Sequence, residues 1–103
     1  MHFYILVRKD LSLPQQMVQA AHAAYESGLS SLCQNDDIVS LVMCQCSNEQ
    51  ELERQAFYLR TLNLPFVEFR EPDIDNQLTA IATLPLDQSQ RILLRHWKLW
   101  REA

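Results

Sequence analysis

The sequence predicts an α/β fold, in which helices cover both faces of a mixed four-stranded sheet as three layers, α/β/α. Four short runs of apolar and β-branched residues alternate with longer segments whose apolar residues recur every three or four positions. Polar links that carry helix-capping residues separate these runs. The resulting order is β-α-β-α-β-β-α. A length of 103 residues suits one core, so we expect a single domain over residues 1–103.

The first strand and the first helix are sharply bounded. Residues 3–7 form a near-continuous apolar run, which is typical of a strand covered on both faces. Ser12 is a suitable helix N-cap, and Gln15 three residues later completes a capping-box pattern. We expect the helix to run to about Ser27 and to end at Gly28, the only glycine in the chain.

A second strand and a second helix follow. Residues 38–46 (IVSLVMCQC) indicate the strand, which is reached through a polar link at 29–37. Residues 47–50 form another capping pattern, and Asn63 can close the helix in the left-handed conformation. The expected apolar side of this helix consists of Leu52, Ala56, Leu59 and Leu62.

The last third of the chain predicts a hairpin and a third helix. Residues 66–70 and 78–84 are the remaining strands, and no other segment resembles one. Because only the acidic turn at 71–76 joins them, they should pair antiparallel. We expect the first three strands to be mutually parallel through right-handed crossovers. A helix added to the core then covers 87–103, and its apolar side consists of Leu93, Leu94, Trp97 and Trp100.

Composition excludes several classes of protein. No apolar run approaches the roughly 20 residues of a membrane span and the N-terminus lacks a signal-peptide pattern, so we expect no membrane partner and a cytoplasmic protein. A single glycine rules out a P-loop, a dinucleotide-binding fingerprint and a nucleophile elbow. Three scattered histidines, and cysteines at 33, 44 and 46, give no zinc spacing. We therefore expect neither a metal nor a cofactor.

The charge pattern leaves two interpretations open. A net charge of −4 argues against a broad nucleic-acid-binding surface, but it allows a local basic patch. The cations of the last predicted helix form either such a patch or an ordinary solvated face. Trp97 and Trp100, three residues apart, either pack in the core or stack on bases. The cations concerned are Arg91, Arg95, Lys98 and Arg101.

Polar residues gather where the parallel strands should end. Open α/β sheets bind ligands beyond the carboxyl ends of such strands, beside helix N-termini. Gln19 and His22 lie one and two turns along the first helix from Gln15, which places His22 roughly 10 Å from it. On topology alone, the residues at this rim are Arg8, Lys9, Asp10, Gln15, Arg70, Glu71 and Asp73.

Each of these candidates has a structural alternative. His22 could serve as a general base near neutral pH, or it could fill space between helix and sheet. Glu71 and Asp73 could orient water or a terminal amine, or they could simply cap their turn. The sequence alone leaves both pairs of alternatives open.

Two motifs are similar to those of the type-2 peptidyl-tRNA hydrolases of archaea and eukaryotes. One is Val7-Arg8-Lys9-Asp10-Leu11 at the end of the first strand, and the other is Gln19-Ala20-Ala21-His22-Ala23 in the helix. Leu64-Pro65 and Arg70-Glu71 resemble the family's segments around its third strand, so that the similarity covers residues 3–84. It implies a mixed four-stranded sheet between helices, tRNA as partner, and cleavage of the ester between a peptide and the terminal ribose of tRNA, with no essential metal.

The resemblance also implies roles for single residues. Glu71 would orient or deprotonate water, Gln19 and Gln15 would hold polar groups, and His22 would support the site. Gln15 stands where the family's last lysine falls, and residues 87–103 lie beyond the family core. The alternative is a non-catalytic module that binds tRNA, a nucleotide or a protein in the same cleft, and a homodimer through the last helix is a further hypothesis. The residues that would bind substrate are Arg8, Lys9, Asp10, Gln15, Arg70 and Asp73.

Overall fold

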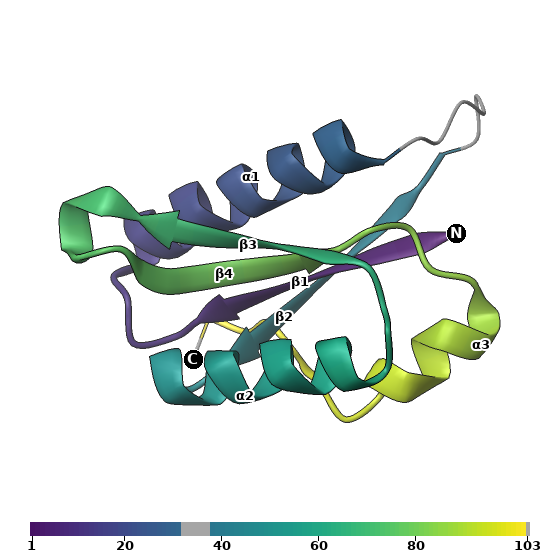
Figure 1. Ribbon diagram of the computed structural model, residues 1–103. Helices are drawn as coiled ribbons and strands as arrows, with labels where there is room; N and C mark the ends of the chain where they lie inside the picture. Colours follow the sequence, from purple (N-terminus) through teal and green to yellow (C-terminus); the bar gives the residue numbers. More distant parts are fainter. Residues whose placement is uncertain (32–37, 103) are drawn as a thin grey trace.

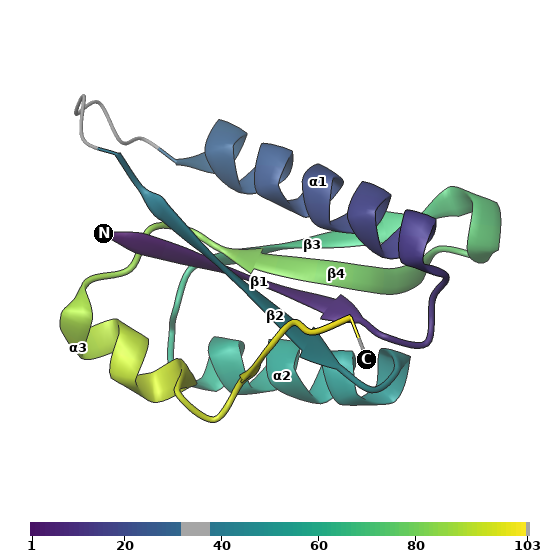
Figure 2. The same cartoon turned by 180° about the vertical axis from the view of Figure 1, so that it is seen from behind.

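A computed structural model describes residues 1–31 and 38–102 and confirms an α/β protein. Five strands form one mixed sheet in the order β3-β4-β1-β2-β5, with α1 on one face and α2 and α3 on the other (Figures 1 and 2). Two short 3₁₀ turns, Pro72–Ile74 and Ile92–Leu94, join the regular elements. The elements are β1 (His2–Arg8), α1 (Leu13–Ser30), β2 (Ser40–Cys46), α2 (Glu49–Thr61), β3 (Phe66–Glu71), β4 (Gln77–Thr83), α3 (Gln88–Arg91) and β5 (Lys98–Leu99).

The first three strands run in the same direction, as expected, and β4 lies between two of them. β1 pairs with β2 in parallel, while β4 lies between β1 and β3 and is antiparallel to both. β1, β2 and β3 therefore run in one direction, and their carboxyl ends meet at one edge of the sheet. The expected hairpin of β3 and β4 is confirmed.

Apolar residues form a separate cluster on each face of the sheet. Under α2, the side chains of Leu52, Ala56 and Leu59 are fully buried, as their helical spacing predicts. Under α1, Ala20 and Ala23 pack against alternate residues of β1 and β4. Small alanines let α1 approach the sheet closely, which brings the polar side of this helix near the strand ends.

Helix α1 differs from the prediction at its end. Ser12 caps its start and accepts a hydrogen bond from the Gln15 backbone, as expected. Gly28, however, stays inside the helix, which continues to Ser30, and it does not take a left-handed conformation. The buried Ser27 hydroxyl donates to the Thr83 carbonyl at 2.7 Å, and this contact fixes the last turns of α1 on the sheet. Packing therefore outweighs the local signal of the glycine.

Helix α2 and strand β2 agree more closely with expectation. Asn63 closes α2 with φ of 55°, as predicted, whereas Asn48, and not Ser47 of the expected capping pattern, caps its start. β2 begins at Ser40, two residues later than expected. The predicted link at 29–37 begins inside α1, and its residues 32–37, which include Cys33, lie outside the described residues.

The predicted C-terminal helix is wrong, and so is the count of four strands. Helix α3 has only four residues, after which a 3₁₀ turn leads into β5 at the edge of β2. The two tryptophans then lie on opposite faces: Trp97 packs under α2, and its indole donates to Gln55 Oε1. Trp100 packs beside α1, and its indole donates to Gln16 Oε1. One continuous helix could not place both rings in this way, so the long helix proposed for a homodimer is also absent from the described residues.

Within the described ranges, no helix combines the length and the hydropathy that crossing a membrane requires.

Candidate functional site

A buried amide connects the side of α1 with the end of β3. Gln19 is fully buried, and its Nε2 donates to Glu71 Oε2 and to Gln15 Oε1, both at 2.9 Å. Its Oε1 lies 3.1 Å from the Thr79 hydroxyl. Both donors and the acceptor of the amide are thus engaged, which fixes its orientation without solvent. The structure therefore brings together Gln15, Gln19 and Glu71, as the sequence predicted.

A β-bulge supplies the fourth member of this group. Phe69 pairs with Ala80 but Arg70 pairs with Leu78, which leaves Thr79 as the extra residue of β4. The hydroxyl of Thr79 is within hydrogen-bond distance of both Gln19 Oε1 and the Phe69 carbonyl. Sequence reasoning missed Thr79, although a polar residue between the apolar Leu78 and Ala80 was a usable signal.

Glu71 offers an ionised carboxylate to solvent at this edge. It ends β3 and caps the following 3₁₀ turn, because its Oε1 accepts the Asp73 backbone N–H at 3.2 Å. The hydrogen bond from Gln19 lowers the pKa of Glu71 most, followed by the bond from the Asp73 backbone. The half-exposed group therefore stays negative near neutral pH and has oxygen lone pairs left for a ligand. Asp73 itself is exposed on the turn.

His22 lies beside this carboxylate and packs on the sheet edge. Its exposed ring stacks on Phe69 with the centroids 4.3 Å apart and the planes 2° from parallel. Neither ring nitrogen has a hydrogen-bond partner within the described ranges, and the proximity of His22 also lowers the pKa of Glu71. The ring thus occupies a packing position and leaves its nitrogens available.

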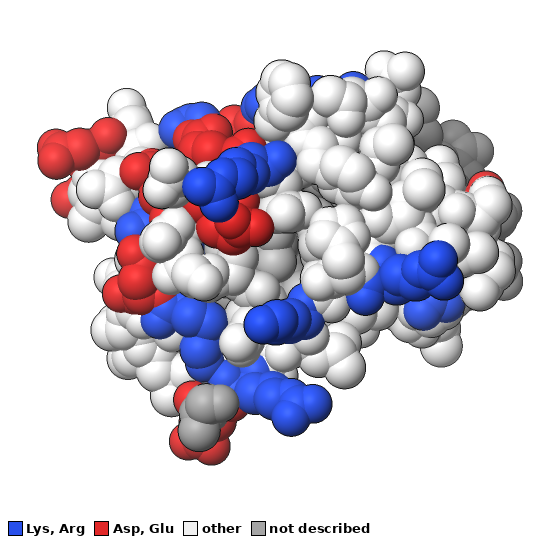
Figure 3. Space-filling model, turned by 90° about the horizontal axis from the view of Figure 1, so that it is seen from below, with Lys and Arg blue, Asp and Glu red and all other residues white. Residues whose placement is uncertain are grey.

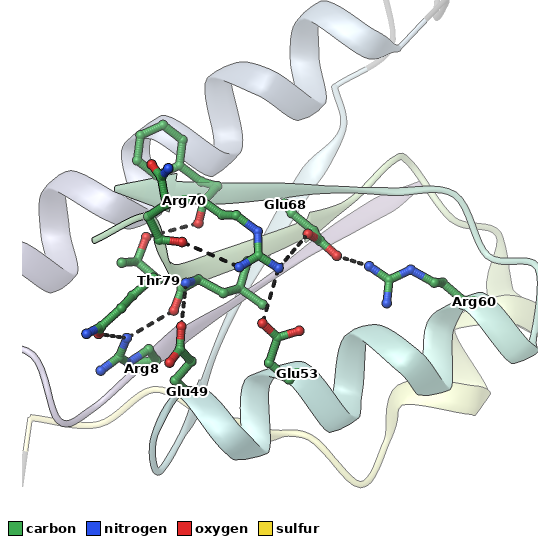
Figure 4. Close-up of polar contacts among 11 residues, drawn as sticks. Arg8, Glu49, Glu53, Arg60, Glu68, Arg70 and Thr79 are labelled. Carbon is green, nitrogen blue, oxygen red and sulfur yellow. Dashed lines mark hydrogen bonds and ion pairs between the residues drawn. The ribbon is translucent and has the colours of Figure 1, made fainter. Parts of the chain in front are cut away.

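Arg8 is engaged almost completely inside the protein. It is 7% exposed, and Nε and Nη2 bind the two carboxylate oxygens of Asp10 at 2.9 and 2.8 Å. Nη1 donates to Gln77 Oε1 and to the Leu78 carbonyl (Figure 4). The hydrogen bond between the two charged groups raises the pKa of Arg8 and lowers that of Asp10. Four of the five guanidinium N–H groups are used in this way, so Arg8 chiefly positions the ends of β1 and β4.

Arg70 points to the opposite face of the sheet from Glu71. Neighbouring residues of a strand alternate in direction, and Arg70 binds Glu53 of α2 and Glu68, two residues earlier in β3 (Figure 4). Its Nη1 also approaches the Asn76 carbonyl. The structure therefore does not bring Arg70 into the group around Gln19.

Lys9 lies on the other flank of α1. Its ammonium donates to the carbonyls of Arg101 and Glu102 and lies 4.6 Å from the centre of the Trp100 ring. The buried Gln16, which sequence reasoning also missed, accepts from the Trp100 indole and donates to the Leu11 carbonyl at 2.8 Å. Two glutamines in succession thus serve opposite flanks: Gln15 faces Glu71, and Gln16 faces Trp100.

The donor set does not favour a metal. Within the described part of the chain, no three side chains of His, Cys, Asp or Glu are close enough together to hold an ion. Burial raises the pKa of the Cys44 thiol to about 11 and, aided by Glu51, that of Cys46 to about 12, so both thiols stay protonated near neutral pH.

Neither a protein-family model nor a curated protein matches this chain.

Proposed function

We propose that the chain is a peptidyl-tRNA-hydrolase-like enzyme that cleaves the ester between a peptide, or another acyl group, and the terminal ribose of tRNA. The observation that supports this most is the half-exposed, ionised Glu71 carboxylate, held by the buried amide of Gln19 at the carboxyl ends of the strands. Ligands of open α/β sheets bind at this edge. We place the activity in the cytoplasm, where peptidyl-tRNA arises.

Glu71 acts on a water molecule. Each carboxylate oxygen already accepts one protein hydrogen bond, from Gln19 and from the Asp73 backbone, and each has a further lone pair. A water that donates to Glu71 attacks the acyl carbon and transfers its proton to the carboxylate. The ester C–O bond then breaks, and the ribose oxygen takes that proton from Glu71 as it leaves.

Gln15 and His22 face the charge that develops on the acyl oxygen. Because Gln15 Oε1 accepts from Gln19, the NH₂ group of this exposed side chain keeps both donors, and neither has a partner among the residues that the structure describes. Such donors stabilise a tetrahedral oxyanion when they are fixed in advance. His22, anchored on Phe69 beside Glu71, can offer a ring N–H as a further donor.

One observation favours the non-catalytic alternative. A general base works best when its pKa is near the working pH, whereas the hydrogen bonds to Glu71 lower its pKa. The same carboxylate, fixed by Gln19, could instead accept hydrogen bonds from a ribose or from a nucleotide base. In that case the chain would bind tRNA or a nucleotide and release it unchanged.

An ester-cleavage assay separates the two functions. Purified chain is incubated with N-acetyl-aminoacyl-tRNA, and release of the acyl group is followed beside a measurement of tRNA binding. The enzyme releases the acyl group, Glu71→Gln slows release about 10²–10⁴-fold, and Asp75→Asn, which removes a carboxylate from the same turn, keeps the activity. Salt-sensitive binding without release would establish the binding module instead, and an active Glu71→Gln would remove Glu71 from the mechanism.

A further inference from the structure

Positive charge is concentrated in the C-terminal segment. Residues 88–101 contain four of the nine Lys and Arg residues and none of the thirteen Asp and Glu residues. The remainder of the chain carries five cations against all thirteen carboxylates, so the net charge of −4 conceals a strongly polarised molecule. Figure 3 shows Lys and Arg side chains extending across one face, with the Asp and Glu side chains gathered toward one side of it.

The cations of this segment are also left without acidic partners. In the rest of the chain, Arg8, Arg54, Arg60 and Arg70 each form an ion pair with a carboxylate. Within the described residues, none of the four cations between 88 and 101 forms an ion pair. The exposed ones are Arg95, Lys98 and Arg101. Unpaired, clustered cations on an acidic protein are what a polyanionic ligand would neutralise.

The backbone holds two of these cations beside an aromatic ring. Strand β5 pairs Lys98 with Gln45 of β2, and Gln45 Oε1 then accepts the Arg101 backbone N–H at 2.8 Å. Lys98, Leu99 and Arg101 line an open hollow with Gln45. Trp100, between them, is half-exposed and lies under the Lys9 ammonium. Cations around an accessible ring are typical of surfaces that bind nucleic-acid strands.

This surface lies at the same end of the molecule as Glu71. Figures 1 and 2 both place the C-terminal tail at the end of the sheet where α1 begins and where β3 turns into β4. The two flanks of α1, marked by Gln16 beside Trp100 and by Gln15 beside Gln19, are separated by about 10 Å, the width of a helix with its side chains. A nucleic-acid strand could therefore contact the cations a few nucleotides from an ester held at Glu71.

We propose that Lys98 and Arg101, together with Lys9 and the Trp100 ring, form a phosphate-binding surface for the backbone of an RNA strand. The choice of RNA among polyanions rests on the proposed function. The site lies in the segment beyond the family core, and it supplies the RNA contact that the buried Arg8 and the paired Arg70 leave unfilled.

The test is binding of deacylated tRNA, measured by fluorescence anisotropy between 50 and 200 mM salt. The variant Lys98→Gln/Arg101→Gln removes two unpaired cations, and the control Arg54→Gln/Arg60→Gln removes two paired cations from α2. We expect the first variant to bind at least tenfold more weakly and to reduce the slope of log K against log salt by about 1.4–1.8. The control keeps both quantities within error, and far-UV circular dichroism verifies that each variant is folded.

Three results would overturn this inference: equal weakening by the two double variants, no weakening by either, or equally tight binding of poly-glutamate at the same cations. Measuring tRNA binding and ester cleavage side by side distinguishes this failure from a failure of the proposed function. If Glu71→Gln and wild type both bind tRNA but neither cleaves the ester, the enzymatic proposal is refuted and the RNA-binding surface remains supported. If ester cleavage on tRNA continues unchanged in Lys98→Gln/Arg101→Gln, the RNA-binding surface is refuted and the enzymatic proposal remains supported.

Discussion

Replacing Gln19 with Met removes the buried amide but keeps an unbranched side chain of similar length. The change deletes the hydrogen bonds to Glu71, Gln15 and Thr79, while the Thr79 hydroxyl keeps the Phe69 carbonyl as an acceptor. At about 0.5–1.5 kcal/mol net for each bond, and with some gain from burying a thioether, the free energy of unfolding should fall by about 1–3 kcal/mol.

The same change should alter the pH dependence of stability. The pKa of Glu71 is lowered from its usual 4.5 in the folded chain, chiefly by Gln19. A carboxylate of this kind stabilises the folded state above its unfolded pKa and loses that contribution as the pH falls through the folded pKa. In Gln19→Met the pKa of Glu71 should rise toward 4.5, so the stability gap between wild type and variant is full at pH 7 and narrows below pH 4.

Urea unfolding at pH 7 and at pH 3.5 measures the gap, and a ¹³C carboxyl titration by NMR follows the pKa of Glu71. The matched control is Gln50→Met, the same substitution at an exposed position of α2, which should change stability by less than about 0.5 kcal/mol. Equal stability of the two variants, or an unchanged pKa of Glu71, would refute the role given to Gln19.

Further predictions concern the residues around the site. Asp10→Asn should cost about 1 kcal/mol at pH 7, less than a fully buried pair, because its side chain is 39% exposed although its partner Arg8 is buried. Because pairing lowers the pKa of Asp10, urea unfolding should show this difference shrinking below pH 4; a difference that stays constant with pH would contradict it. Cys44 and Cys46 should react with iodoacetamide at pH 8 far more slowly in the folded chain than in urea, and rapid labelling located by peptide mapping would contradict their raised pKa values of about 11 and 12. Leu59→Ala should lower the free energy of unfolding by about 2–5 kcal/mol through an unfilled space in the core, and a loss below 1 kcal/mol in thermal or urea unfolding would place Leu59 outside it.

Local patterns predicted the regular core of the fold. The periodicity of α2 and its left-handed Asn63 were predicted correctly, and its cap was missed by one residue, because each depends on residues within a few positions of one another. The parallel direction of the first strands followed from the helices that join them. The chain beyond Asp87 was mispredicted. A spacing of three residues places Trp97 and Trp100 on one face if the segment is a helix, but on opposite faces of the sheet if it is extended.

The candidate site likewise contains residues that the sequence predicted and residues that it did not. Gln15, Gln19 and Glu71 were placed together by helix spacing, by strand topology and by the family resemblance. Thr79 was missed because its direction depends on a bulge, a feature of pairing between two strands that neither strand reveals alone. Arg70 could have been separated from Glu71 by simple strand alternation.

The surface that the C-terminal cations form depends on whether the backbone of this segment is helical or extended. On a helix, Arg91, Arg95, Lys98 and Arg101 would have formed a solvated stripe. As part of an extended edge beside β2, Lys98 and Arg101 instead flank Trp100, and neither forms an ion pair within the described residues.

The rate of ester cleavage in a single turnover tests the central claim most directly. Enzyme in excess over N-acetyl-aminoacyl-tRNA isolates the chemical step, and wild type is compared with Glu71→Gln under conditions in which both are folded and bound. We expect cleavage well above the rate in buffer, and a first-order rate constant that falls by about 10²–10⁴-fold in the variant. A wild-type rate equal to that of buffer, or a variant as fast as wild type, would contradict the role of Glu71 as the group that activates water.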